Sequence, residues 1–245
     1  AGRGCQYNCA FCKPGTDLIF GKHSRRRNVN SVLAELEGLN IGSLFIHDDN
    51  LIEDVPWCLE FLDKWDGRPF VIQGRADIIV RREPLLEQMA AHGLVGMLIG
   101  FESGSDKVLR AMRKGTTRKL NEQAAAIGHR LGITMQANMI FGTPHETKED
   151  VFASFELIDK HLLPCIISPA IYTPYPGSDW GKYVTEKGWN LVKDTYAYSR
   201  MADGTARLAE AALGYSYEWL YRTLHAKGLY PPDGVIRFKL NEVAQ

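Results

Sequence analysis

The sequence predicts an α/β fold: a partial (β/α)6 barrel of the TIM type, followed by a mostly helical carboxyl-terminal extension. Three observations lead to this prediction. Five short apolar runs each precede a stretch with helix signals, polar and glycine residues gather directly after each run, and 45% of the 245 residues are hydrophobic. A repeating β/α order requires a parallel sheet with helical crossovers, and the active site of such a barrel is built from the loops at the carboxyl ends of its strands.

Local signals in the sequence predict where helices begin. Asn30 can cap a first helix, Asp54 followed by Pro56 opens a second, and Thr147 with Asp150 resembles a capping box before the last of the series. The apolar runs predict strands at 43–47, 70–73, 95–101, 133–141 and 165–172. The expected helices cover 30–39, 54–65, 83–92, 105–113, 118–131 and 147–161.

Residues 1–27 precede the first predicted helix and are expected to form a loop, because glycines and prolines interrupt them and no periodicity is sustained. In a repeating β/α order, this loop would follow a strand that lies upstream of residue 1. Counting that strand gives six strands in the barrel. The chain has no initiator Met, so we expect it to be a fragment of a longer protein.

The β/α order breaks down after about residue 177, where the sequence becomes rich in Trp, Tyr and Gly. Helices are expected here at 203–213 and 216–227. One face of the second helix carries Tyr217, Leu220, Tyr221 and Leu224. We therefore divide the chain into a barrel, 1–180, and a helical cover or extension, 181–245.

Composition and charge restrict the class of protein. Lys plus Arg and Asp plus Glu are both 29, so the formal net charge is +0. A balanced surface argues against nucleic acid as the main partner. No apolar run approaches the roughly 20 residues that a membrane span needs. Three of the five cysteines are clustered, which indicates a reducing compartment with thiols free for metal, and we expect the cytoplasm.

The clustered cysteines are Cys5, Cys9 and Cys12, three thiols within eight residues. A four-iron cluster is usually held by four thiolates, whereas here the local count stops at three. Cys58 and Cys165 lie far away, in a predicted helix and a predicted strand, and are expected in the core. A three-cysteine site keeps one metal position open, as a catalytic zinc site does. A closed zinc site would need a fourth ligand, and a disulfide framework suits short secreted chains.

With Phe11 directly before Cys12, the CxxxCxxC spacing resembles the radical S-adenosylmethionine (SAM) superfamily. The resemblance implies that Cys5, Cys9 and Cys12 bind a 4Fe–4S cluster whose open iron chelates SAM. It also implies a one-electron donor such as flavodoxin or ferredoxin, reductive cleavage of SAM, and a 5′-deoxyadenosyl radical that removes hydrogen from a substrate.

The same resemblance gives roles to the loops at the strand ends. Asp48, Asp49 and Asn50 occupy the place of the segment that binds the methionyl amino group. Glu102 and Ser103 resemble the segment that approaches the ribose and the carboxylate. Helix N-cap chemistry stays open as the alternative for the two aspartates. An interior Glu without a ligand would be costly, which favours a functional role for Glu102.

Gln136 and Asn138 alternate on one strand and therefore face the same side, so both are candidate ligands of cofactor or substrate. By resemblance, Ile140 belongs to the segment that lines the adenine, and Phe11 belongs with the cofactor-binding residues. Tyr172 could lie near adenine or substrate, and an ordinary core or turn residue stays open as its alternative.

Four further residues are left with alternatives. Arg75 and Asp77 could reach cofactor or substrate, or form a structural ion pair. Lys114 is either a carboxylate ligand or a solvated helix end. His47 is expected to be packed, because alternation points it away from Asp48.

Within the superfamily, the chain most resembles the cobalamin-binding branch, whose members carry a cobalamin domain before the barrel and many of which methylate small molecules. This implies a cobalamin-dependent methyltransferase or a related enzyme that modifies carbon–carbon bonds or rings. Methylthiotransferases that act on tRNA or ribosomal protein share much of the pattern and are the alternative. A non-catalytic zinc or iron–sulfur protein is the alternative of another class.

Overall fold

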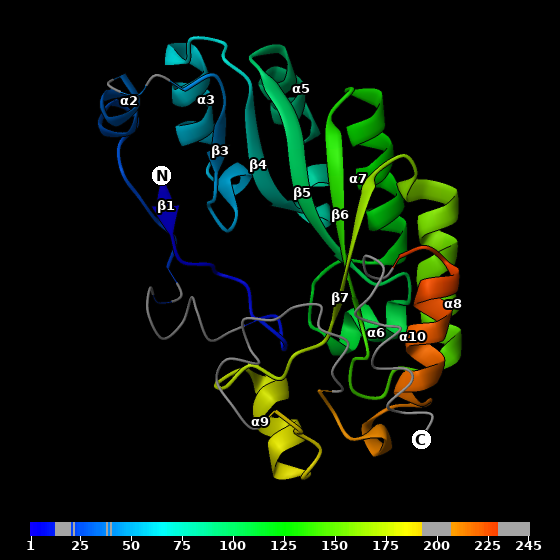
Figure 1. Cartoon of the computed structure of the whole chain (residues 1–245). Coiled ribbons are helices and arrows are strands. Elements are labelled where there is room, and N and C mark those ends of the chain that lie inside the picture. Colours follow the sequence, from blue (N-terminus) through cyan, green and yellow to red (C-terminus); the bar gives the residue numbers. More distant parts are fainter. Residues whose placement is uncertain (13–20, 22, 38, 40, 193–206, 230–245) are drawn as a thin grey trace.

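Five parallel strands form the main sheet of the computed structural model, in the order in which they occur along the chain (Figure 1). The structure describes residues 1–12, 21, 23–37, 39, 41–192 and 207–229. The strands are β3 (Leu44–Ile46), β4 (Phe70–Arg75), β5 (Leu94–Glu102), β6 (Thr134–Phe141) and β7 (Ile166–Ile171). All five were predicted, and the α/β class with its barrel-like parallel sheet is confirmed. The sixth strand, expected upstream of residue 1, stays a prediction.

Helices connect the strands in the expected alternation. They are α2 (Val29–Glu37), α3 (Val55–Lys64), α4 (Ala76–Arg81), α5 (Glu83–Ala91), α6 (Asp106–Ala111), α7 (Arg118–Arg130) and α8 (Lys148–Leu157). The side chain of Asp54 caps α3 by accepting from the Trp57 N–H at 3.2 Å, and Thr147 with Asp150 forms the predicted capping box of α8. The short helix α4 was not predicted, because its residues follow β4 without a break.

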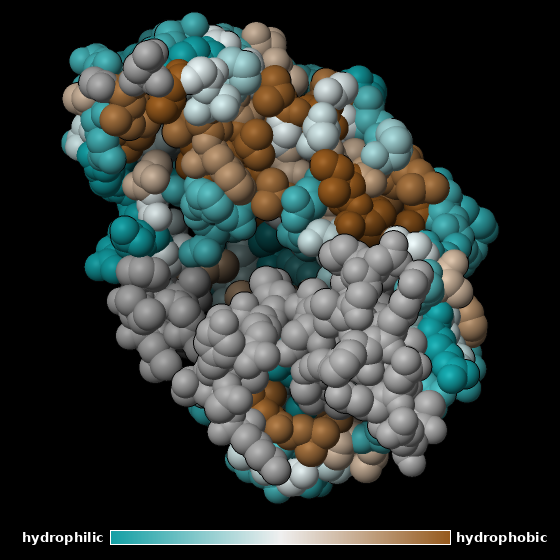
Figure 2. Space-filling model, viewed as in Figure 1, coloured by the Kyte–Doolittle hydropathy of each residue, from teal (hydrophilic) through white to brown (hydrophobic). Residues whose placement is uncertain are grey.

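The two faces of the sheet differ. Along β6, Met135, Ala137, Met139 and Phe141 are buried against the helices, while the alternating Gln136 and Asn138 are only half-buried. Helices α5 and α7 cover the buried face (Figure 1). Figure 2 is viewed toward the other face, where hydrophobic and hydrophilic residues are intermingled around a central hollow. The sheet therefore buries one face and leaves the other open for a site.

The amino-terminal segment lies outside this sheet. β1 (Gly2–Arg3) and β2 (Arg25–Arg26) pair antiparallel as a separate two-stranded ribbon. After β7 come α9 (Asp179–Glu186) and, further along, α10 (Tyr217–Ala226), the helix that was expected at 216–227. The predicted apolar face of α10 is buried in the same core cluster as Phe141 and Phe155. The extension thus packs directly on the barrel.

The helix expected at 203–213 is wrong over its described part. Leu208 instead forms an isolated antiparallel bridge with Asn190, and Glu210–Ala212 is a single 3-10 turn. The Leu208 N–H donates to the Tyr217 hydroxyl at 3.1 Å, and the Ala212 carbonyl accepts from the His145 N–H at 2.7 Å. These backbone groups bond to other segments, which overrides the local helix pattern; residues 203–206 lie outside the described part. In the described ranges, no helix is long and apolar enough to cross a membrane.

Candidate active site

A pocket at the carboxyl ends of the strands contains all three clustered cysteines. Cys5, Cys9 and Cys12 line it together, and its empty space is about 820 Å³. The other lining residues come from the amino-terminal loop, the segment after β3, strands β4 to β6 and the loop after α6, and include Asp49, Arg75, Glu102, Lys114 and Asn138. The amino-terminal loop and four strand ends thus meet at the edge where a barrel of this type carries its chemistry.

The cysteine loop is fixed by backbone hydrogen bonds at its centre. The Ala10 N–H donates to the Met112 carbonyl at 2.8 Å, and the Ala10 carbonyl accepts from the Trp180 N–H at 3.0 Å. The Cys12 N–H donates to the Cys9 carbonyl at 3.2 Å, which closes a turn between these two cysteines. Two segments distant in sequence therefore hold the loop over the pocket, and this anchoring was not visible from the motif.

The pocket contains a buried ion pair. The Lys114 ammonium contacts the Glu102 carboxylate at 2.6 Å, and each side chain is less than a tenth exposed. Glu102 has a φ of 64° and lies at a register irregularity between β5 and β6. A Cβ at Gly100 would lie 2.3 Å from Glu102 Oε1, so a larger residue here would have to displace the ends of the Glu102 and Lys114 side chains. The pair thus depends on a local distortion of β5 that turns the Glu102 side chain toward Lys114.

This pair corrects two sequence-based interpretations. Lys114 is buried, so the alternative of a solvated helix end is wrong. Glu102 is buried as expected, but the inference that its burial requires a ligand does not hold, because Lys114 neutralises it. Both residues remain candidates for ligand contact since both line the pocket.

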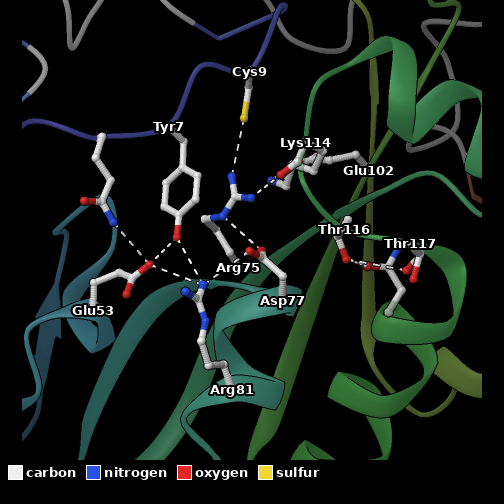
Figure 3. Close-up of polar contacts among 12 residues, drawn as sticks. Tyr7, Cys9, Glu53, Arg75, Asp77, Arg81, Glu102, Lys114, Thr116 and Thr117 are labelled. Atoms are coloured by element: carbon white, nitrogen blue, oxygen red, sulfur yellow. Dashed lines mark hydrogen bonds and ion pairs between the residues drawn. The ribbon is translucent and has the colours of Figure 1, made fainter.

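Arg75 and Asp77 form the ion pair that was one of their two alternatives, with Nε and Oδ1 3.0 Å apart. Arg75 also reaches the pocket, where its Nη1 lies 3.4 Å from the Cys9 sulfur (Figure 3). The Tyr7 ring packs on the guanidinium, with its centroid 3.6 Å from Cζ. Tyr7 was missed in the sequence; the signal for it was an aromatic residue inside the cysteine motif.

The segment after β3 sends its acidic side chains to opposite sides. Asp49 lines the pocket. Its burial is the main factor that raises the pKa of its carboxyl group, and the negative charge of the neighbouring Asp48 raises this pKa further. Asp48 is buried away from the pocket and pairs with Arg26. The Asn50 side chain is also buried and lines a separate pocket behind the cysteine loop. Of this trio, the structure thus brings only Asp49 into the pocket that holds all three cysteines, whereas Asn50 shares the second pocket with Cys5.

Of the remaining candidate residues, some line the cysteine pocket and others are buried outside it. Asn138 lines the pocket and accepts from the Gln136 amide at 2.9 Å, so the two side chains lie on one face as predicted. Ser103 is buried, and its hydroxyl accepts from the Ser105 N–H at 3.1 Å rather than lining the pocket. Tyr172 is buried against Trp180, with ring centroids 5.4 Å apart.

The aromatic residues beside the cysteines form their own contacts. Phe11 lines the pocket and its ring lies 6.4 Å from that of Trp180. Ile140 is partly buried against the same small cluster as Phe11.

The packed environment expected for His47 is wrong. His47 is exposed on the open face, where its ring contacts that of Phe45 and its Nδ1 lies 3.1 Å from Gln73 Nε2. Cys58 is buried as predicted, whereas Cys165 is only partly buried against the core.

The donor set of the pocket fits a metal cluster better than a single ion. A single zinc ion needs four ligands at about 2.0–2.3 Å from one point. Among the described residues, no three His, Cys, Asp or Glu side chains are arranged closely enough to hold one metal ion. The three thiols instead line one pocket, and among its lining residues there is no fourth Cys or His. This set suits a larger inorganic group with one open position.

No protein-family model matches the chain. Curated relatives nevertheless resemble it over most of its length. The anaerobic magnesium-protoporphyrin IX monomethyl ester cyclase of Rubrivivax gelatinosus is 28% identical over 72% of this chain and 33% of its own length. A putative methylthiotransferase of Methanocaldococcus jannaschii is 29% identical over 72% of this chain and 42% of its own. The bacteriochlorophyllide d C-12(1)-methyltransferase of Chlorobaculum tepidum is 26% identical over 81% of this chain and 45% of its own. The chain thus spans less than half the length of each.

Solved structures share the fold. TsrM from Kitasatospora setae, a radical SAM methyltransferase with cobalamin and a 4Fe–4S cluster bound, has a TM-score of 0.62 and 18% identity over 79% of this chain and 40% of that chain. OxsB, a cobalamin-dependent SAM radical enzyme, has a TM-score of 0.58 and 18% identity over 94% of this chain and 35% of that chain. The predicted resemblance to radical SAM enzymes is confirmed at the level of the fold, which this chain shares with cobalamin-dependent members.

Proposed function

We propose that this chain is the barrel portion of a radical SAM enzyme, with Cys5, Cys9 and Cys12 as the ligands of a 4Fe–4S cluster. The observation that carries the proposal is the pocket itself: three cysteines of one loop share it with charged side chains from the strand ends, and no fourth Cys or His lines it. When bound, such a cluster supplies the electron that cleaves SAM to a 5′-deoxyadenosyl radical.

The other pocket residues would bind and orient SAM. Asp49 offers carboxylate oxygens to a methionyl amino group, and Lys114 offers an ammonium to a carboxylate. Glu102 would then share Lys114 with the ligand and accept from a ribose hydroxyl. Phe11 and Ile140 supply apolar contact for the adenine. The open face of β6, with Gln136 and Asn138, is left for the substrate.

For the whole protein we propose a cobalamin-dependent methyltransferase, or a related enzyme of small-molecule biosynthesis, that uses a flavodoxin or ferredoxin as electron donor. The methyltransferases and the cyclase among the relatives support this assignment. The cobalamin domain would be supplied by a part of the protein before residue 1. The alternative, a methylthiotransferase, is supported by the relative from Methanocaldococcus jannaschii, while the formal net charge of +0 weighs against an RNA substrate.

Anaerobic reconstitution with iron and sulfide tests the proposal. The wild-type chain should take up a 4Fe–4S cluster whose electron paramagnetic resonance (EPR) spectrum changes when SAM is added. Cys9→Ala should lose the cluster, whereas Cys58→Ala, a buried cysteine outside the pocket, should keep it. Tight zinc binding by wild type, with no four-iron spectrum and no response to SAM, would instead support the non-catalytic metal protein.

A further inference from the structure

Arg75, the last residue of β4, uses its whole guanidinium group in contacts between segments. Its Nη1 donates to the Cys9 sulfur at 3.4 Å, its Nε donates to Asp77 at 3.0 Å, and its Nη2 donates to the Lys114 carbonyl (Figure 3). The residue is only 6% exposed. One side chain therefore joins the cysteine loop, the start of α4 and the loop after α6.

The surroundings hold the guanidinium in this position. The Tyr7 ring covers one face of it, and the Tyr7 hydroxyl is itself held by Glu53 and lies 3.4 Å from Arg81. A Cβ at Gly115 would lie 3.3 Å from Arg75 Nη2, so the loop closes tightly behind the group. Because these neighbours fix the orientation of the Arg75 guanidinium, the N–H directed at Cys9 is preorganised.

On the basis of the proposed function, we infer that Arg75 is a positioning residue for Cys9 that also tunes the reduction potential of the cluster. Reduction adds one electron to a group beside the buried guanidinium, where a positive charge is poorly screened by water. Hydrogen bonds to ligand sulfurs and nearby charge are among the factors that set cluster potentials. Arg75 therefore makes reduction easier and holds the Cys9 thiolate in place.

An ion pair with Asp77 alone does not account for this geometry. The two residues are neighbours across the junction of β4 and α4, and Nε by itself satisfies that contact. Both terminal nitrogens point away from Asp77, one to the cysteine loop and one to the Lys114 carbonyl. Arg75 thus has a contact with the cysteine loop that the ion pair does not require.

The test is an EPR-monitored redox titration of the reconstituted full chain, without SAM, with titanium(III) citrate as reductant. Arg75→Met removes the charge and the donors but keeps an unbranched chain, and its midpoint potential should shift to more negative values. Arg75→Lys keeps the charge and should shift less in the same direction. Arg130→Met removes an arginine of α7 that is paired with two glutamates of α5 outside the pocket, and it should leave the potential unchanged.

A second measurement separates the thiolate contact from the ion pair. Asp77→Asn removes the carboxylate partner and keeps Arg75, so any shift of the potential should be toward less negative values, opposite to that of Arg75→Met, because a nearby negative charge is lost. Loss of iron to a chelator should be faster in Arg75→Met than in Asp77→Asn, because only the former frees Cys9.

Three outcomes would overturn the inference. One is a wild-type potential in a fully loaded Arg75→Met variant. Another is an Asp77→Asn variant that reproduces the whole shift. If Arg75→Met does not fold or load, a wild-type potential in Arg75→Lys is the third. Failure of the wild-type chain itself to take up a four-iron cluster would count against the proposed function, which is a different result.

Discussion

Two regions at the carboxyl edge of the sheet bury a carboxylate, and they do so in opposite ways. In the cysteine pocket, Glu102 is paired with the ammonium of Lys114 beside open space. The second region is the contact between loop 142–147 and segment 212–215, which we call the joint. Here Glu146 is fully buried and accepts hydrogen bonds from neutral donors, the Gly142 N–H at 2.7 Å and the Tyr215 hydroxyl. A charge pair next to a cavity leaves groups for a ligand, whereas a carboxylate enclosed by neutral donors serves structure.

At the joint, backbone hydrogen bonds link the loop after β6 to the segment before α10. The Gly214 N–H donates to the Glu146 carbonyl at 2.8 Å, and the His145 N–H donates to Ala212. His145 has a φ of 62° and its ring nitrogen lies 2.8 Å from the Tyr183 hydroxyl. His145 thus contacts both α9 and the segment before α10. The pocket and the joint should therefore respond differently to loss of a charge and to a change of pH.

The largest effect is expected in the pocket, from Lys114→Met. This change leaves the Glu102 carboxylate buried without its partner, which costs about 3 to 5 kcal/mol of unfolding free energy. The double variant Lys114→Met/Glu102→Gln removes both charges and should recover most of the loss. Urea unfolding of the three proteins gives the values. Equal destabilisation of the single and double variants would show that the pair does not compensate Glu102.

The next effect is at the joint and depends on pH. Burial raises the pKa of Glu146 to about 7, against 4.5 as its ordinary value. Between these values the unfolded chain ionises Glu146 while the folded chain keeps its proton, so the stability falls as pH rises and the full cost is reached above pH 7. Glu146→Gln should therefore gain roughly 3 kcal/mol relative to wild type between pH 4.5 and pH 8.

Thermal or urea unfolding at several pH values checks this slope. Glu149→Gln, an exposed carboxyl on the same loop–helix junction, is the matched control and should not show the same gain toward high pH. A Glu146→Gln variant whose stability relative to wild type is the same at pH 4.5 and pH 8 would contradict the prediction.

A smaller effect is expected from Tyr215→Phe, which removes the hydroxyl donor from Glu146. The loss of one hydrogen bond to a carboxylate costs about 1.5 to 3 kcal/mol when Glu146 is ionised, so the effect should be larger at pH 8 than at pH 5. Cluster content after reconstitution should be unchanged, because Tyr215 does not line the cysteine pocket. A large loss of cluster in this variant would show that the joint affects the cysteine pocket, and would contradict a purely structural role for the joint.

The smallest effect is expected from Ser216→Ala, which removes the N-cap of α10. Ser216 accepts from the Trp219 N–H at 3.2 Å, and loss of such a cap costs about 1 kcal/mol. The denaturant midpoint should fall slightly at every pH, without the pH dependence expected for Glu146. Ser216→Thr, which keeps a capping hydroxyl, should stay close to wild type.

Local sequence patterns were enough to predict the three-thiol motif, the β/α order and the positions of the strand ends. These depend on contiguous residues: thiol spacing, apolar runs and caps such as Asp54 before α3 act within a few positions of one another. Alternation also predicted that Asp48 and His47 point in opposite directions. It did not say which of them faces the pocket.

Which side chains meet depends instead on how the strands and loops pack in three dimensions. The register of β3 on β4, which pairs Leu44 with Phe70, places Asp49 in the pocket and Asp48 against Arg26. Cys9 and Arg75 are 66 residues apart, and their contact depends on how the loop is anchored as well as on strand register. A slip of one residue reverses every side chain of a strand, so such contacts are set by the packing of the whole sheet and not by any local pattern.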